Sequence, residues 1–272
     1  PSRLVRSYEN YPEIIDAPFA DSGIQSDSII DVNSADGQEI TRLPGEADAP
    51  RVMKLMQLGL SGGRPIKAVL AESIEAGGST IRDYARCAKL ARDAGYDGIE
   101  VMGSEGYFIN QFLVTHTNHR SDEWGGPYAN RMRLAVEIVR RIREAVGPDF
   151  ILIYRISLID LIPDGSSWPE VLELARAVSA AGATILNTGI GWHEARIPTI
   201  ATKVPRAAYA WVTQRLMGSV KIPLVATNRI NTPEVAEQLL RDGFCNMVSM
   251  ARPFLADPDF VRKAAEGKAD EI

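Results

Sequence analysis

From residue 80 to its end, the chain alternates short apolar segments with amphipathic helical segments, and this alternation limits the folds that it can adopt. The segment Phe150–Ser157 is a continuous apolar run apart from one arginine, as expected for a parallel strand that is covered on both faces. The helical segments carry apolar residues at helical spacing and end at glycines. Strands and helices that alternate in this way predict βα units around a parallel sheet.

Five such units are recognisable. The expected strands are Gly98–Gly103, Phe150–Ser157, Thr184–Thr188, Pro223–Thr227 and Met247–Met250. The expected helices run from Thr80 to Gly95, from Pro127 to Gly147, from Ser167 to Gly182, near Ala207–Met217, over Pro233–Asp242 and over Pro258–Glu266. Two of them start with a capping-box pattern, Thr80 with Asp83 and Ser167 with Glu170, and in the second Pro169 is the expected first helical residue.

Periodicity alone is compatible with a barrel and with a doubly wound sheet. The polar residues of interest follow strand ends, where a (β/α)8 barrel keeps its active site. Three further βα units need roughly 90 residues at about 30 each, and the first 75 residues are too few and too polar for that. We therefore expect residues 51–272 to form a (β/α)8 TIM-barrel domain with five clear units and an incomplete or remodelled start. We expect residues 1–50 to form an atypical, partly irregular segment.

Composition excludes several classes of function. The formal net charge of −5 argues against broad binding of nucleic acid or a membrane surface, although a local basic pocket remains compatible with it. No apolar stretch of about 18 residues and no signal peptide is visible. Cys87 and Cys245 lack a CxxC partner. We therefore expect both to be small buried side chains of a protein in the reducing cytoplasm, and we assign neither as a metal ligand. Because the chain begins at Pro1 and not at methionine, we expect a fragment or a processed form.

The strand at Gly98–Gly103 leads into Glu105-Gly106-Tyr107 at the head of a short helix. A phenol with a pKa near 10 is protonated at neutral pH, so Tyr107 can donate a proton across the mouth of the site. Alternatively, Tyr107 only caps the barrel. With the following Thr117-Asn-His-Arg-Ser-Asp-Glu-Trp-Gly-Gly126, this stretch resembles the old-yellow-enzyme family of flavin-binding barrels, in which a Gly-Tyr pair precedes an Asn-x-Arg-x-Asp-x-x-Gly-Gly loop and a long helix.

Two segments narrow the resemblance to the 2,4-dienoyl-CoA reductases of that family. They are Met102-Gly-Ser-Glu-Gly-Tyr107 and Asn187-Thr-Gly-Ile-Gly-Trp-His193-Glu-Ala-Arg-Ile-Pro-Thr199. Other members carry a histidine and a second histidine or asparagine at positions that look like Met102 and Glu105 here. The resemblance implies that Tyr107 supplies the proton and that His193 assists it, since an imidazole titrates near neutral pH. It also implies that reduced FMN reduces an activated C=C bond of an unsaturated acyl-CoA.

The same resemblance implies residues that bind substrate. His116 stands where the dienoyl-CoA branch has an arginine that helps to bind substrate, and a histidine can keep part of that role. Glu194, Ala195 and Arg196 follow His193 directly and are expected to contact substrate with it.

Arg155 lies within an apolar strand, and a buried arginine needs an anionic or electron-rich partner. An internal salt bridge is one solution. The resemblance implies another, contact with the pyrimidine side of the flavin, where a positive charge favours the anionic reduced form. Gln57 resembles a glutamine of the family that faces the flavin pyrimidine, although the His-x-Gly-Arg that usually follows it lacks its histidine here.

The last two strands are followed by Thr227-Asn-Arg229 and by Met250-Ala-Arg252. Loops at these two strand ends form the usual phosphate-binding corner of a (β/α)8 barrel. Backbone N–H groups and arginine suit a phosphate monoester. The resemblance places the FMN phosphate on Arg229, Ala251 and Arg252; exposed arginines without a ligand are the alternative.

The resemblance stops near both ends of the chain. The flavin-contacting turn of the family's first strand is not visible in residues 1–50. Full-length dienoyl-CoA reductases continue with an iron–sulfur cluster and a second flavin domain, so FAD, NADPH and the electron donor are expected outside this chain. Two other functions stay open: a catalytically silent fragment, and a barrel enzyme that binds phosphate without flavin. None of the five strands ends in the lysine that a Schiff-base aldolase needs.

Overall fold

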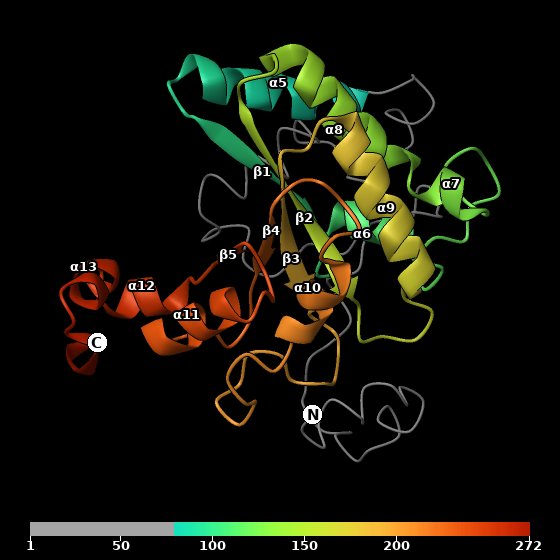
Figure 1. Ribbon diagram of the computed structural model, residues 1–272. Helices are drawn as coiled ribbons and strands as arrows, with labels where there is room; N and C mark the ends of the chain where they lie inside the picture. The colour runs from blue at the N-terminus through green and yellow to red at the C-terminus, as the bar shows by residue number, and fades with distance from the viewer. Residues whose placement is uncertain (1–78) are drawn as a thin grey trace, which may run out of the picture.

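The fold is known from a computed structural model that describes residues 79–272. Five parallel strands form one sheet, and helices lie against it (Figure 1). The strands are β1 (Gly98–Gly103), β2 (Ile151–Ile159), β3 (Ile185–Ile190), β4 (Leu224–Ala226) and β5 (Met247–Val248).

The strands pair in the order in which they occur along the chain, β1-β2-β3-β4-β5, and every pair is parallel. A doubly wound sheet reverses its strand order at a switch point, whereas consecutive units of a barrel do not. Right-handed crossovers then bring all the connecting helices to one side of the sheet. The described part therefore consists of five consecutive units of a (β/α)8 barrel, as expected.

Side chains of each strand alternate between the two faces of the sheet. In β2, Leu152, Tyr154 and Ile156 face the helices and are fully buried. Ile153 and Arg155 point to the opposite face and are only partly buried, so β2 is completely covered on one face. Parallel pairing sets Met102 opposite Arg155, and Arg155 opposite Asn187, which places these three side chains in one row on the inner face.

The helices are amphipathic, and α5, α8 and α9 pack side by side (Figure 1). The elements are α5 (Ser79–Asp93), α6 (Phe108–Leu113), α7 (Tyr128–Arg131), α8 (Arg133–Val146), α9 (Trp168–Ala181), α10 (Ala210–Leu216), α11 (Pro233–Arg241), α12 (Arg252–Ala256), α13 (Phe260–Ala265) and the 3-10 turn η1 (Ala269–Glu271). The predicted capping box of α9 is confirmed: the Glu170 carboxylate accepts hydrogen bonds from the backbone N–H and the hydroxyl of Ser167, both at 2.8 Å. Trp168 is the first helical residue and Pro169 the second.

Three further expectations about the helical segments were wrong. The helix from Pro127 is interrupted at Met132, which separates α7 from α8. The helix expected near Ala207–Met217 is present as α10, and it begins at Ala210 because Ala207 has a left-handed φ of 55° that no right-handed helix contains. Thr80 lies inside α5, and its buried hydroxyl has no partner among the described residues, so it forms no capping box. Cys87 is exposed because it lies beside the buried stripe of α5.

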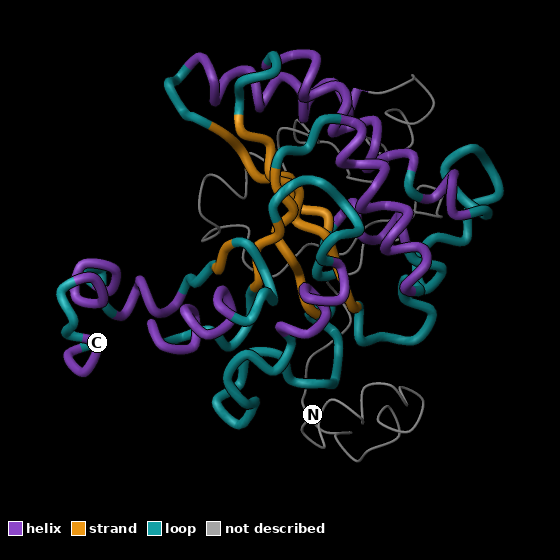
Figure 2. Tube along the Cα trace, viewed as in Figure 1, coloured by secondary structure: helices purple, strands orange, loops and turns teal. Residues whose placement is uncertain are grey.

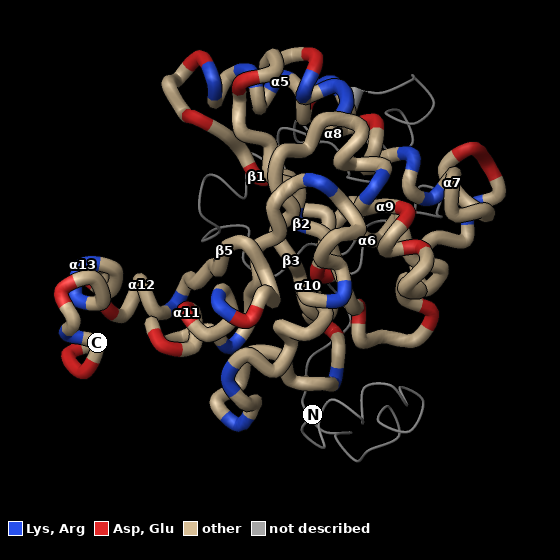
Figure 3. The backbone as a smooth tube through the Cα atoms, viewed as in Figure 1, with Lys and Arg blue, Asp and Glu red and all other residues tan. Residues whose placement is uncertain are grey.

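α11 packs against β5, whereas α12 and α13 lie farther out, toward the C-terminus, as the tube in Figure 2 shows. Charged residues of both signs are spread over helices and loops (Figure 3). Among the described residues, no helix is long and apolar enough to cross a membrane. The same residues contain no group of three or more His, Cys, Asp or Glu side chains that could hold a metal ion.

Candidate active site

The loop after β1 turns sharply at the carboxyl edge of the sheet. Glu105 and Gly106 both have positive φ angles, 64° and 83°, and such strain in a non-glycine residue is typical of functional sites. A side chain at Gly106 would lie 2.8 Å from the indole ring of Trp192, so only glycine fits this close approach. The turn places Tyr107 at the start of α6, as the sequence predicted.

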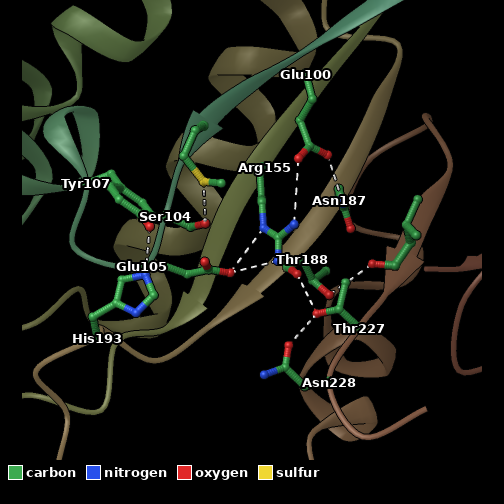
Figure 4. Close-up of polar contacts among 12 residues, drawn as sticks. Glu100, Ser104, Glu105, Tyr107, Arg155, Asn187, Thr188, His193, Thr227 and Asn228 are labelled. Carbon is green, nitrogen blue, oxygen red and sulfur yellow. Dashed lines mark hydrogen bonds and ion pairs between the residues drawn. The ribbon is translucent and has the colours of Figure 1, made fainter. Parts of the chain in front are cut away.

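Tyr107 and His193 meet at this edge of the sheet, although they are 86 residues apart. The phenol oxygen lies 2.9 Å from His193 Nε2, and the two rings make an edge-on contact with centroids 5.1 Å apart (Figure 4). The backbone N–H of His193 also donates to the Glu105 carbonyl at 3.4 Å. The expected pairing of Tyr107 with His193 is therefore present as geometry, and a proton can pass between the two groups.

The surroundings of Tyr107 keep its phenol protonated. Burial raises the pKa of Tyr107, and the negative charges of Glu105 and Glu194 raise it further, against the opposing charge of Arg155. The acidic form is therefore the populated one at neutral pH. His193, by contrast, is exposed.

Arg155 forms the internal ion pair that was one of its two expected solutions. Its Nε and Nη2 donate to Glu105 Oε1 at 3.1 and 2.7 Å, and its Nη1 lies 3.6 Å from Glu100 Oε1 (Figure 4). Asn187 Nδ2 donates to the second oxygen of Glu100 at 2.6 Å. The positive charge of Arg155 is thus paired with two carboxylates. A flavin in contact with Arg155 would share that charge with Glu100 and Glu105.

The ends of β4 and β5 carry the residues expected to hold phosphate. Asn228 and Arg229 have successive positive φ angles, 66° and 59°, so the backbone turns tightly after β4. Arg229 donates to the carbonyls of Val204 at 2.8 Å and Thr202 at 3.3 Å. Arg252 follows Ala251 at the start of α12, and its side chain makes no hydrogen bond or ion pair within the described part of the chain.

The residues expected to bind substrate lie around Trp192, the residue before His193. His116 makes an edge-on contact with the Trp192 ring at 5.8 Å, and its backbone N–H donates to the Asp164 carbonyl at 3.1 Å. The N–H of Ala195 donates to the Trp192 carbonyl at 3.1 Å. Glu194 and Ala195 are partly buried and Arg196 is exposed. These residues therefore share one region beside the Tyr107–His193 pair.

Comparison with known families agrees with this architecture. Residues 47–271 match the NADH:flavin oxidoreductase / NADH oxidase family. The chain belongs to this family. The match includes all five strands and every site residue of the described part.

Relatives within the NADH:flavin oxidoreductase family differ in their chemistry. The chain is 36% identical to a metal reductase of Desulforamulus reducens over 86% of its own length and 34% of that protein's. It is 33% identical to a multifunctional alkene reductase/demethylase of Caballeronia cordobensis, over 70% of this chain and 28% of that protein. The chain thus spans about a third of the length of these family members.

Two solved structures have the same fold over most of this chain. A 2-naphthoyl-CoA reductase in complex with 2-naphthoyl-CoA superposes with a TM-score of 0.71 at 32% identity, covering 74% of this chain and 30% of that one. An old yellow enzyme homologue from Zymomonas mobilis superposes with a TM-score of 0.58 at 28% identity, over 73% of this chain and 53% of that one. These likenesses confirm the barrel class expected from the sequence.

Two features of the site were not predicted from the sequence. Glu100, like Arg155, is a charged residue within an apolar strand, and this pattern could have identified it. The two side chains form an ion pair across the sheet. Asp160, at the end of β2, is buried beneath the loops that carry Tyr107 and His193. Gln57 and the proposed boundary between residues 50 and 51 lie outside the described residues.

Proposed function

We propose that this family member binds FMN and reduces an activated, conjugated C=C bond of an unsaturated acyl-CoA, as in 2,4-dienoyl-CoA reduction. The single observation that carries the proposal is the hydrogen bond of 2.9 Å between Tyr107 and His193 at the carboxyl edge of a parallel sheet. Such a pair supplies a general acid at the place where barrel enzymes bind their substrates.

In this proposal Tyr107 delivers the proton. Reduction of a conjugated C=C bond leaves negative charge on the substrate, which a neutral phenol can neutralise by protonation. The pKa of Tyr107 is raised by burial and by Glu105 and Glu194, so the phenol is protonated when substrate arrives. After the transfer, His193 returns a proton to the phenolate through Nε2 and recovers its own proton from water.

Reduced FMN, when bound, supplies the hydride, and the chain contributes placement and charge. Arg229, Ala251 and Arg252 would hold the FMN phosphate. Their chemistry fits, because Arg252 is a cation that no described residue engages, and the backbone after β4 is turned tightly at Arg229. We further propose that Arg155 and Gln57 face the flavin ring. The electron donor is proposed to be a domain or protein outside this chain.

The proposed substrate class rests on the loops around Trp192. His116, Glu194 and Ala195 lie beside the Tyr107–His193 pair, and Arg196 is an exposed cation in the same loop. An exposed arginine suits the phosphate groups of coenzyme A. The 2-naphthoyl-CoA reductase that shares the fold has an aromatic acyl-CoA in its structure, which supports a thioester substrate here.

The test is to add FMN to the purified chain, remove unbound flavin and record the visible spectrum. The expected result is bound flavin, which dithionite reduces and a 2,4-dienoyl thioester then reoxidises without oxygen. A saturated thioester of equal length is the control and should leave the flavin reduced. A chain that binds no flavin would support the silent fragment or a non-flavin barrel, and bound flavin that the dienoyl thioester leaves reduced would refute the substrate class.

A further inference from the structure

Asp160 is a buried carboxylate that takes no part in the proposed chemistry. It follows β2 directly and is 3% exposed. Its Oδ1 accepts hydrogen bonds from Ser157 Oγ at 2.6 Å, Trp192 Nε1 at 3.0 Å and Asn110 Nδ2 at 3.4 Å. Its Oδ2 accepts from the backbone N–H of Ser166 at 2.7 Å. All four partners are donors, which is the environment that an ionised carboxylate requires.

One of these contacts leads to Tyr107. Asn110 donates to Asp160 through its amide nitrogen and accepts the backbone N–H of Gly106 through its amide oxygen at 2.9 Å. Gly106 is the residue directly before Tyr107. The contact with Asp160 thus orients the Asn110 amide, and the amide fixes the turn from which the phenol projects.

Another contact leads to His193. Trp192 is held twice by Asp160: its indole N–H donates to the carboxylate, and its backbone N–H donates to the Asp160 carbonyl at 2.9 Å. Trp192 directly precedes His193, and its ring lies so close to Gly106 that a side chain there would be 2.8 Å away. The two loops therefore meet at one indole ring whose polar edge is fixed by Asp160.

We propose that Asp160 is a positioning residue that sets the geometry of the Tyr107–His193 pair. The carboxylate contacts neither side chain and acts through Asn110 of α6 on one side and through Trp192, in the loop after β3, on the other. Hydrogen bonds to a charged acceptor are stronger than those between neutral groups, which makes an ionised aspartate better suited to this place than a neutral amide. The catalytic consequence of this role rests on the proposed function, whereas the geometric role does not.

The Asp160→Asn variant tests the geometric role without cofactor or substrate. An asparagine has one acceptor oxygen, so its NH2 group must face either Ser166 N–H or the three donors around Oδ1. In ¹⁵N NMR spectra of the cofactor-free protein, the Trp192 indole and His193 imidazole resonances should shift. Trp192→Phe, which removes the indole donor, assigns the indole signal and should perturb His193 as well.

Glu170→Gln is the matched control. Glu170 is a partly buried carboxylate that accepts hydrogen bonds from Ser167 and Arg131, and no contact joins it to Trp192 or Asn110. Its replacement should leave the His193 and Trp192 signals unchanged. Unchanged His193 signals in Asp160→Asn would overturn the proposal. If Asp160→Asn does not fold, Trp192→Phe decides by the same His193 readout.

A kinetic measurement then tests the consequence. In the FMN-loaded protein, Asp160→Asn should slow reoxidation by dienoyl thioester by up to about 10²-fold, the loss expected when reacting groups are displaced by about 1 Å. FMN affinity should stay at the wild-type value. Wild-type protein that never reduces the thioester would refute the proposed function and leave the NMR result to decide on Asp160. A normal rate in Asp160→Asn beside an active wild type would overturn the positioning role.

Discussion

Replacing Tyr107 with phenylalanine removes one oxygen atom and keeps the aromatic ring at the N-cap position of α6. That oxygen bonds to His193 Nε2 at 2.9 Å and to none of the residues proposed to hold the FMN phosphate. FMN should therefore still bind and be reduced by dithionite in Tyr107→Phe. Only the step that protonates substrate should fall.

The size of the loss follows from the state of the phenol. Because burial and two carboxylates raise the pKa of Tyr107, nearly every molecule carries the acid at neutral pH, and the variant loses all of its contribution. General-acid catalysis contributes about 10²–10⁴-fold, which corresponds to about 3–5 kcal/mol of activation free energy. In the wild type, the rate should fall only as pH rises above the ordinary tyrosine pKa of about 10, through the raised value of Tyr107. Tyr107→Phe should lack this decline.

His193 should matter less than Tyr107. His193→Ala leaves the phenol in place but removes the group that returns its proton, so a smaller loss is expected. The double variant should be little slower than Tyr107→Phe, because residues that act as one unit are not additive.

Stopped-flow absorbance measures these rates directly, by mixing dithionite-reduced protein with dienoyl thioester under anaerobic conditions. Tyr209→Phe is a matched control, since the Tyr209 hydroxyl also takes part in a hydrogen bond of 2.9 Å, in which it donates to the Pro198 carbonyl. It should cost about 1 kcal/mol of folding stability and leave the rate unchanged. A wild-type rate in Tyr107→Phe would refute the reasoning and return Tyr107 to a role as a cap of the barrel.

Three further predictions concern other residues. Arg155→Met should raise the pKa of Tyr107, because the charge of Arg155 lowers it, and should lower the reduction potential of bound flavin; NMR titration of labelled tyrosine and a redox titration measure the two effects, and an unchanged potential would mean that Arg155 serves only its carboxylates. The double variant Arg229→Ala/Arg252→Ala should weaken FMN binding and its salt dependence in equilibrium titrations, and equal affinity would remove both residues from the phosphate site. Tyr154→Phe should be neutral or stabilising by about 1 kcal/mol, because the buried phenol has no partner among the described residues. Burial raises the pKa of Tyr154, so wild-type stability should fall above about pH 10, where the unfolded chain ionises first, and denaturant titrations should show a smaller fall in the variant.

The sequence predicted the features that depend on neighbouring residues. Strand positions follow from short apolar runs, and the Ser167–Glu170 box forms because both partners lie within one helical turn. The Tyr107–His193 pairing was also foreseen, although only through resemblance to a family, since no local pattern joins residues 86 positions apart.

The remaining features depend on tertiary contacts. The sequence predicted that Arg155 needs an anionic partner, but no local pattern identified that partner. The turn after β1 brings Glu105 to Arg155, and cross-strand pairing brings Glu100 to it. Asp160 was missed because an aspartate after an apolar strand looks like an ordinary loop residue. Its buried partners, Asn110 and Trp192, come from α6 and from the loop after β3.

Strand pairing in the described sheet is more extensive between β1 and β2 than between β4 and β5. β1 and β2 pair from Gly98–Ile151 to Gly103–Ile156, whereas β4 and β5 pair only at Val225–Met247 and Ala226–Val248. Local opening requires least free energy where few pairings and few buried contacts must break. Amide hydrogens of β4 and β5 should therefore exchange with solvent before those of β1 and β2. A phosphate ligand at the β4–β5 edge could then enter or leave through local unfolding while the loops that hold the proton donor keep their arrangement.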